Sequence, residues 1–376
     1  MTPNERLANA FAGLAVDRVA YVPKIWVDLA ANLTDTQLRS VIEDPRLAMQ
    51  VIVDAGILVG ADAVRQFVFP VRKTEREGDQ VFEVDEAGTR LGTIDMLGGL
   101  ATHLFDASYF RLEDPYFIAH QPFWKADEPF IGDLDDAKRV AIPDKSFYDE
   151  AGYGDFLQQM IEHAGDRIAL IGDCDSPTLS FYAGFRGVER SMMDIYDDPR
   201  LLHAVMEKGA ARSIERGKFN IDMGLRILRL NDSMANMSLV SPKDWREFIY
   251  PHFKTVCDEL HNYCPGVKIY CHICGNILPI IEPLMATGLD CIAPLDPLGG
   301  FSVAEVREAV GKSMVLMGGI DTLSFLHSSP EQIAEEARRC IEEGGAHFIL
   351  GSGCVVPRRA SKEMLQAVAE TVQSLA

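Results

Sequence analysis

Short apolar runs alternate along this chain with longer segments in which apolar residues recur at helical spacing. Eight of the runs have the length of buried strands. They cover residues 21–26, 63–67, 168–172, 227–230, 268–271, 290–293, 314–318 and 348–352. Strands that alternate with helices predict a parallel sheet with helices outside it. Eight such strands are the number that closes an α/β barrel.

Capping signals predict where helices begin in the second half of the chain. Ser329 is followed by Pro330 and, three residues after the serine, by Gln332. This is the capping-box pattern with proline at the first helical position. Ser302 and Glu305 repeat the capping-box spacing. Both helices are expected to follow a barrel strand.

Two segments interrupt the alternation. Residues 71–93 read as short alternating strands with turns at 77–80 and 86–89, which predicts a small β-hairpin insertion. Residues 105–146 are rich in Asp, Pro and aromatic residues and are expected to form a long loop. We therefore predict an α/β fold with one domain over residues 1–376. It is a single (β/α)₈ TIM-type barrel with an N-terminal helical extension and the hairpin insertion.

Charge and hydropathy exclude two classes of partner. The formal net charge is −20, so an anionic duplex or membrane surface would repel the chain. No apolar run reaches the roughly 20 residues that a spanning helix needs. The first residues do not lead into the core of a signal peptide. We expect a cytoplasmic protein that binds neither nucleic acid nor membrane.

The strongest chemical signal is a histidine and two cysteines placed just after strand runs. His272 and Cys274 follow the run 268–271 and stand two residues apart, so both can point to one side of an extended strand end. Cys354 follows the run 348–352. The carboxyl ends of barrel strands converge on one face, so the three side chains are expected to meet. One imidazole and two thiolates suit Zn²⁺, and three protein ligands leave the open position of a catalytic site.

Asp296 is the candidate for an exchangeable fourth ligand, because it ends the next strand run. The alternative for any His-x-Cys pair is that the cysteine packs as a small apolar residue. The remaining six of the eight cysteines are expected to have no chemical role.

Three further residues follow strand runs that end on the same face. Asp232 is the candidate catalytic residue, either binding substrate or orienting His272 through a hydrogen bond. A helix or turn cap is the open alternative for this aspartate. Asp175 and Tyr182 are candidates for cofactor binding, with core packing as the alternative for the tyrosine.

Four segments carry a resemblance to a known family. They are an opening helix with an Asp-Arg-Val turn at 6–19, the hairpin at 84–90, a Ser-Pro segment at 239–251 and the ending at 344–354. Together they resemble the uroporphyrinogen decarboxylase superfamily. Within it, the chain is most similar to the corrinoid-linked methyltransferases, such as the methylcobamide:coenzyme M methyltransferases.

The resemblance implies a TIM barrel and a zinc site on His272, Cys274 and Cys354. Distantly related cobalamin-independent methionine synthases add an acidic ligand, and Asp296 stands at a similar offset, as Asp where those enzymes have Glu. The implied activity is a zinc-dependent methyltransferase that moves a methyl group between a corrinoid and a thiol acceptor. The chain has no Asp-x-His-x-x-Gly motif for a corrinoid. The corrinoid, as methylcobalamin, is therefore expected on a separate carrier protein.

Three other functions remain open. The methyl acceptor could be a folate such as tetrahydrofolate, the chain could be a metal-free decarboxylase of this superfamily, or a zinc ion could only stabilise a binding protein. Porphyrinogen decarboxylases carry an arginine-rich loop after the first strand. Residues 22–33 contain no arginine, and a net charge of −20 suits a polyanionic substrate poorly. These two observations count against decarboxylation.

Overall fold

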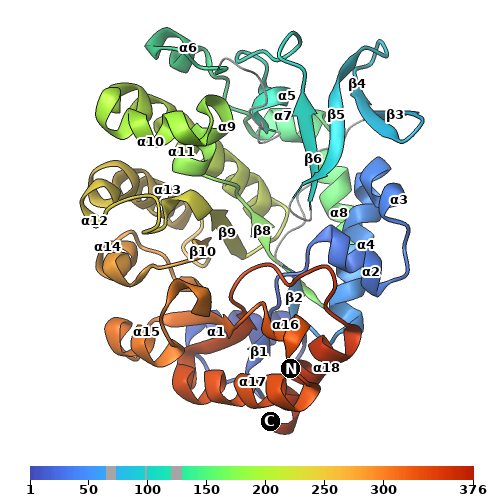
Figure 1. Cartoon of the computed structure of the whole chain (residues 1–376), viewed down its shortest axis with the longest axis vertical. Helices are drawn as coiled ribbons and strands as arrows, with labels where there is room; N and C mark the ends of the chain where they lie inside the picture. Colours follow the sequence, from blue (N-terminus) through green and yellow to red (C-terminus); the bar gives the residue numbers. More distant parts are fainter. Residues whose placement is uncertain (65–72, 98–99, 120–128) are drawn as a thin grey trace.

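Seven parallel strands form a curled sheet at the centre of the molecule (Figure 1). The computed structural model describes residues 1–64, 73–97, 100–119 and 129–376. In spatial order the strands are β1 (Ala20–Tyr21), β13 (Phe348–Ser352), β12 (Val315–Ile320), β11 (Cys291–Leu295), β10 (Lys268–His272), β9 (Ile227–Asn231) and β8 (Gly172–Asp173). The fold is α/β, and the curled parallel sheet is consistent with a TIM-type barrel.

A second, two-stranded sheet joins the two edges of the first. Strand β2 (Ala63–Val64) pairs in parallel with β7 (Ala169–Leu170), and β7 is followed after one residue by β8. At the other edge, the backbone N–H of Asp62 donates to the carbonyl of Tyr21 at 2.8 Å. Each of the eight predicted runs overlaps one of these strands. Residues 65–67 of the second run lie outside the described residues.

The N-terminal helix fills one end of the sheet interior. Helix α1 (Pro3–Ala12) begins with a capping box between Thr2 and Glu5. Its Leu7 and Phe11 are buried in one cluster with inward residues of the strands, and the Phe11 ring lies 6.3 Å from that of Tyr270. Apolar side chains therefore fill the end of the sheet interior that α1 covers. The polar side chains described below stand at the carboxyl ends of the strands.

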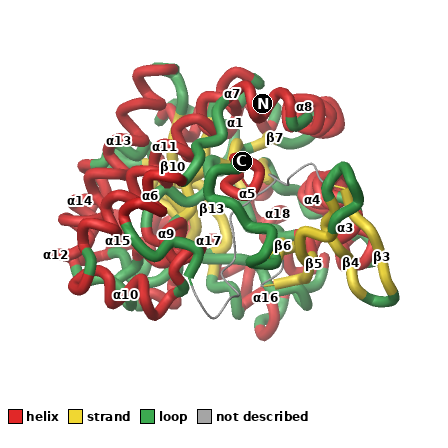
Figure 2. Tube along the Cα trace, turned by 90° about the horizontal axis from the view of Figure 1, so that it is seen from above, coloured by secondary structure: helices red, strands yellow, loops and turns green. Residues whose placement is uncertain are grey.

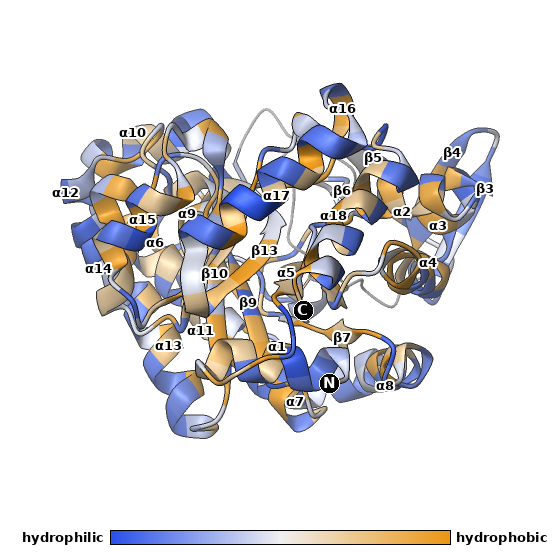
Figure 3. Cartoon of the chain, turned by 90° about the horizontal axis from the view of Figure 1, so that it is seen from below, coloured by the Kyte–Doolittle hydropathy of each residue, from blue (hydrophilic) through white to orange (hydrophobic). Residues whose placement is uncertain are grey.

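Most of the remaining helices surround the sheet (Figure 3), and their buried apolar residues join one core cluster. They are α2 (Val27–Leu33), α3 (Leu38–Glu43), α4 (Pro45–Leu58), α8 (Tyr153–Ala164), α9 (Leu179–Arg186), α10 (Val188–Asp197), α11 (Pro199–Asp222), α12 (Pro242–Asp244), α13 (Tyr250–Tyr263), α14 (Ile281–Ala286), α15 (Val303–Val310), α16 (Ser324–His327), α17 (Pro330–Gly344) and α18 (Lys362–Ser374). The capping boxes predicted for α15 and α17 are both present. In the described part of the chain, no helix combines the length and the apolar character needed to cross a bilayer.

The insertion is larger than predicted. Four antiparallel strands project at one side of the molecule beside α3 and α4 (Figure 2). They are β3 (Lys73–Glu77), β4 (Gln80–Val84), β5 (Arg90–Leu97) and β6 (Leu100–Phe105). The predicted turns at 77–80 and 86–89 fall between consecutive strands, but the sheet runs on to residue 105 instead of ending at 93.

The prediction of one long loop over 105–146 is wrong for the described residues. Helices α5 (Pro115–Ala119) and α6 (Leu134–Arg139) lie within it, and α7 (Lys145–Glu150) begins there. The aspartates that suggested a loop include Asp133 and Asp144, whose side chains accept backbone N–H groups as helix N-caps. Residues 120–128 of this segment lie outside the described residues.

Candidate metal centre

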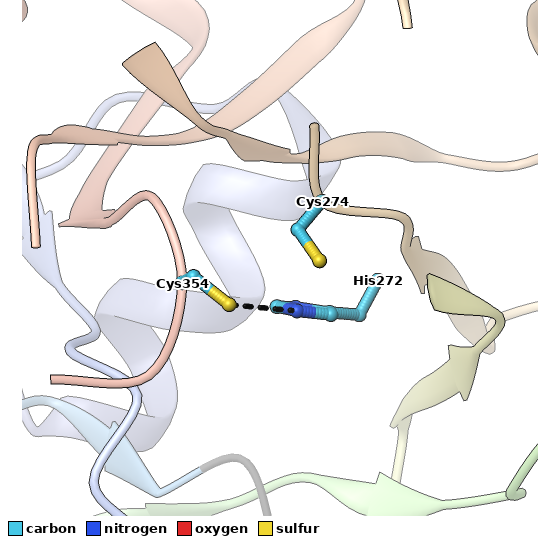
Figure 4. Close-up of side chains that lie close together, drawn as sticks. All are labelled: His272, Cys274 and Cys354. Carbon is cyan, nitrogen blue, oxygen red and sulfur yellow. Dashed lines mark hydrogen bonds between the residues drawn. The ribbon is translucent and has the colours of Figure 1, made fainter. Parts of the chain in front are cut away.

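One histidine and two cysteines converge at the carboxyl ends of two strands. His272 is the last residue of β10, Cys274 follows two residues later, and Cys354 lies just beyond β13. One ligand atom from each lies within 4.8 Å of the others, and Cys354 Sγ is 3.9 Å from His272 Nε2 (Figure 4). The imidazole is buried and both thiols are half-buried. The structure therefore brings together the three side chains that the sequence analysis expected to meet.

A tight turn after Cys274 and close backbone packing beside Cys354 set the positions of the two cysteine loops. Gly275 adopts a φ of +86°, which turns the chain directly after Cys274 and which few residues other than glycine tolerate. At Gly353, next to Cys354, an added Cβ would lie 2.9 Å from the Cα of Asp296. A side chain at position 353 would thus displace the loop that carries the second thiol.

Asp296 lies between these loops and outside the three-residue group. One carboxylate oxygen accepts the backbone N–H of Gly275 at 3.2 Å, and the other accepts that of Leu298 at 3.1 Å. Burial raises the pKa of Asp296, and the two backbone hydrogen bonds oppose that rise. These contacts give Asp296 a positioning role, in which it ties the loop after β10 to the loop after β11. A direct ligand role for Asp296 stays a prediction.

A hydrogen bond between the two thiols shifts their pKa values in opposite directions. A hydrogen bond from Cys274 lowers the pKa of Cys354, and the positive charge of Lys24 lowers it further, against the effect of burial. The same hydrogen bond, with burial, raises the pKa of Cys274. Cys354 is consequently the first of the pair to become a thiolate, the form that binds metal ions.

Lys24 is a residue of the centre that the sequence analysis missed. It is 2% exposed, and its Nζ lies 3.0 Å from His272 Nε2 and 4.8 Å from the centroid of the Trp26 ring. The signal was available, since Lys24 closely follows β1 and strand ends converge. Lysine is not a usual metal ligand, and the predicted strand 21–26 included this residue, so the pattern of ligand types did not point to it.

Asp232 caps a helix. Its side chain is completely buried, and it accepts the backbone N–H of Thr178 at 3.0 Å and that of Ser180 at 2.9 Å. The hydroxyls of both residues donate to the same carboxylate. Burial raises the pKa of Asp232, and these hydrogen bonds oppose the rise. The contact between Asp232 and His272 is between backbone groups, since the Asp232 N–H donates to the His272 carbonyl at 3.1 Å. The contacts match the cap alternative, and the catalytic role stays a prediction.

The two predicted cofactor-binding residues lie outside the three-residue group found among the described residues. The Asp175 carboxylate forms ion pairs with Arg212 at 3.0 Å and Arg216 at 3.2 Å, and both arginines are buried. The Tyr182 hydroxyl donates to Asp194 at 2.6 Å and is fully buried. The Asp175 ion pairs fasten α11 to the residues after β8, and the Tyr182 hydrogen bond joins α9 to α10, which is the packing alternative for the tyrosine.

Comparison with known proteins adds a family match to this geometry. The family model described as uroporphyrinogen decarboxylase (URO-D) matches residues 124–375. The methylated-thiol–coenzyme M methyltransferase of Methanosarcina mazei is 29% identical over 182 residues, which is 48% of this chain and 47% of that protein. The uroporphyrinogen decarboxylase of Chlorobium phaeovibrioides is 27% identical over 234 residues, which is 58% of this chain and 63% of that protein. The chain thus spans about half to two thirds of the length of these relatives.

A solved structure shares the fold. The structure described as a methyltransferase from Methanosarcina mazei superimposes with a TM-score of 0.72 at 17% sequence identity. The superposition covers 100% of this chain and 99% of that one. At this identity the likeness establishes a common architecture, and the chemistry has to be argued from the side chains.

Proposed function

The chain belongs to the uroporphyrinogen decarboxylase family, and from that premise we propose that it is a zinc-dependent methyltransferase acting between a corrinoid and a thiol. The observation that carries the proposal is the convergence of His272, Cys274 and Cys354 within 4.8 Å. The name of the methyltransferase relative from Methanosarcina mazei supports the reaction class.

The donor set fits zinc. One imidazole nitrogen and two sulfurs form a borderline-soft set, which Zn²⁺ accepts in tetrahedral sites. Three protein ligands leave one position for substrate, as in catalytic zinc sites. When bound there, a zinc ion would keep a substrate thiol in its deprotonated, nucleophilic form. The corrinoid would arrive on a separate carrier protein.

Residues of the chain position the three side chains and limit the access of water. His272 stands on a strand, which fixes its ring, while the loop residues Gly275 and Gly353 set the positions of the two thiols. Cys354 carries negative charge readily, for the reasons given above. The half-buried position of both cysteines limits water around the reacting sulfur, which strengthens electrostatic interactions there.

Family membership alone does not choose between methyl transfer and decarboxylation, since several relatives are uroporphyrinogen decarboxylases. The basic residue content after β1 favours methyl transfer. Lys24 is the one basic residue in the stretch 22–33, and its ammonium group lies against His272. A polycarboxylate would find no basic cluster in this stretch. The two thiols likewise favour a thiol acceptor over a folate, whose activation does not require a soft metal site.

A single cysteine substitution tests the proposal. We expect the wild-type protein to carry about one zinc ion per chain and to transfer methyl from methylcobalamin to 2-mercaptoethanol. Cys274→Ser should lose the metal and lower methyl transfer more than about a hundredfold, since loss of an outer-shell partner alone costs about 10- to 100-fold. Its thermal midpoint should stay near that of the wild type, because the fold does not depend on the open site.

The matched control is Cys264→Ser, which removes a half-buried thiol outside the three-residue group. It should keep both metal and activity. A wild-type protein that transfers methyl groups without bound metal would refute the zinc mechanism. Transfer to tetrahydrofolate but to no thiol would refute the acceptor class, and decarboxylation of a porphyrinogen without methyl transfer would refute the reaction.

A further inference from the structure

Two polar side chains line the interior of the sheet beside His272. Arg229 and Asn231 follow Ile227 at alternate positions of β9, and Ile227 is buried in the inward apolar cluster, so both polar side chains face inward as well. Asn231 is in register with His272 on the neighbouring strand β10. Neighbouring strands lie about 4.8 Å apart, so Asn231 is close to any ligand that binds next to His272.

The guanidinium group of Arg229 is held firmly but has a donor to spare. The residue is 2% exposed. Its Nη1 donates to the carboxylate of Asp173 on β8 at 2.6 Å, and its Nη2 donates to Asn231 Oδ1 at 2.7 Å. The Nε atom, by contrast, is buried and has no hydrogen-bond acceptor among the described residues. Buried donors are costly to leave unpaired, so this N–H is suited to receive a ligand atom.

The geometry of a guanidinium group shows where this donor points. The N–H of Nε and one of the two N–H groups of Nη2 lie on the same edge of the planar group, an arrangement that fits an oxyanion. Because Nη2 reaches Asn231, the Nε–H points to the same side as Asn231, which is half-buried. Asp173 binds at Nη1 and leaves this edge available. The hydrogen bond from Asn231 Nδ2 to Ser176 Oγ is long, at 3.5 Å, so the amide can donate elsewhere.

We propose that Arg229 and Asn231 form a subsite for an anionic tail, a carboxylate or a sulfonate, at the end of the acceptor opposite its sulfur. The inference rests on the proposed function and deepens it, because it assigns the acceptor to short thiols that carry an oxyanion. The sulfur binds beside His272, and the tail accepts hydrogen bonds from Arg229 Nε and Asn231 Nδ2. Since Asp173 already offsets the charge of Arg229, these hydrogen bonds set the preference for the anion.

Asn231→Asp tests the subsite with little change of shape. The new carboxylate can accept from Arg229 Nη2, and the Ser176 hydroxyl can turn to donate to it, so the local hydrogen bonds remain while an oxyanion is repelled. Calorimetric titration of the full-length, zinc-loaded protein measures the binding. Asn231→Asp should weaken the binding of 3-mercaptopropionate by roughly tenfold to a hundredfold, the range for one hydrogen bond to a charged group. The neutral thiol 3-mercapto-1-propanol should be affected much less. Titration with 2-mercaptoethanesulfonate shows whether the subsite prefers a sulfonate or a carboxylate.

A second variant and a control complete the experiment. Arg229→Lys keeps a positive charge opposite Asp173 but lacks the Nε–Nη2 edge, so it should also weaken the anionic thiols selectively. Asn262→Asp makes the same substitution as Asn231→Asp at an exposed position of α13 and should change no titration.

Three results would overturn the inference and leave the metal site intact. They are an equal loss of anionic and neutral thiols in Asn231→Asp, no change in either, and a wild-type protein that binds the neutral thiol as tightly as the anionic ones. A wild-type protein that binds zinc but no thiol would instead refute the proposed function, and the inference with it.

Discussion

Asn in place of Asp232 separates a structural from a catalytic role, because it preserves shape and changes hydrogen-bonding capacity. The carboxylate accepts one backbone N–H and one hydroxyl on each oxygen, from Thr178 and Ser180. In either orientation, the amide introduced by Asp232→Asn would turn its NH₂ group toward one such pair. The hydroxyl can rotate to accept, but the backbone N–H cannot, so a buried donor faces a donor.

The expected cost follows from these contacts. A buried donor left without an acceptor costs about 1–3 kcal/mol, and hydrogen bonds to a charged acceptor are stronger than those to a neutral one. Asp232→Asn should therefore lower the free energy of unfolding by about 2–4 kcal/mol. Since the substitution touches only the cap of α9, the zinc content and the methyl transfer of the folded fraction should change less than about tenfold.

Urea unfolding followed by circular dichroism measures the stability, and metal analysis with a methyl-transfer assay at low denaturant measures the function. Asp166→Asn, at an exposed position, is the control and should stay within about 0.5 kcal/mol of the wild type. An Asp232→Asn protein as stable as the wild type, yet reduced in methyl transfer by orders of magnitude, would refute the cap argument. It would establish Asp232 as a catalytic residue.

Two further substitutions test the packing beside Cys354 and the protonation of a half-buried histidine. Gly353→Ala puts a methyl group against the backbone of Asp296 and should shift the Cys354 loop, which lowers zinc affinity by about tenfold in a chelator competition; unchanged affinity would contradict the packing argument. Burial and the neighbouring His203 lower the pKa of His252 to about 4. As the pH falls, His252 is therefore protonated in the unfolded chain before it is protonated in the folded one. The free energy of unfolding should fall by up to about 3 kcal/mol as the pH drops from about 6.5 to about 4. Urea unfolding at several pH values should show that His252→Asn lacks this part of the fall in the free energy of unfolding. If the free energy of the variant differs from that of the wild type by the same amount at every pH, the assignment to His252 is wrong.

The succession of strands along the chain could be predicted from the apolar runs, and the meeting of His272, Cys274 and Cys354 follows from one further rule. Carboxyl ends of parallel strands converge, so residues placed just after apolar runs share a face. That rule found His272 and both cysteines, and it places Lys24 as well. It could not tell what Asp232 and Asp175 bond to. Their partners come from helix beginnings and from arginines on α11, and spacing along one strand carries no information about residues that approach from elsewhere.

One of the three side chains stands on a strand and two stand on loops, and this difference helps to distinguish a catalytic from a structural metal site. His272 belongs to β10 and is buried, whereas Cys274 and Cys354 stand on loops that each pack closely against the loop after β11. At Gly299 an added Cβ would lie 2.6 Å from the carbonyl carbon of Gly275, so a third loop packs on the first. Ile273, one residue before Cys274, and Val356, two residues after Cys354, are buried in the main apolar core, so both loops are anchored by apolar packing. Because this anchoring does not involve a metal ion, we expect the parallel sheet to stay folded when none is bound. That behaviour is expected of a site built to exchange a ligand, and it differs from that of a metal ion that holds a fold together.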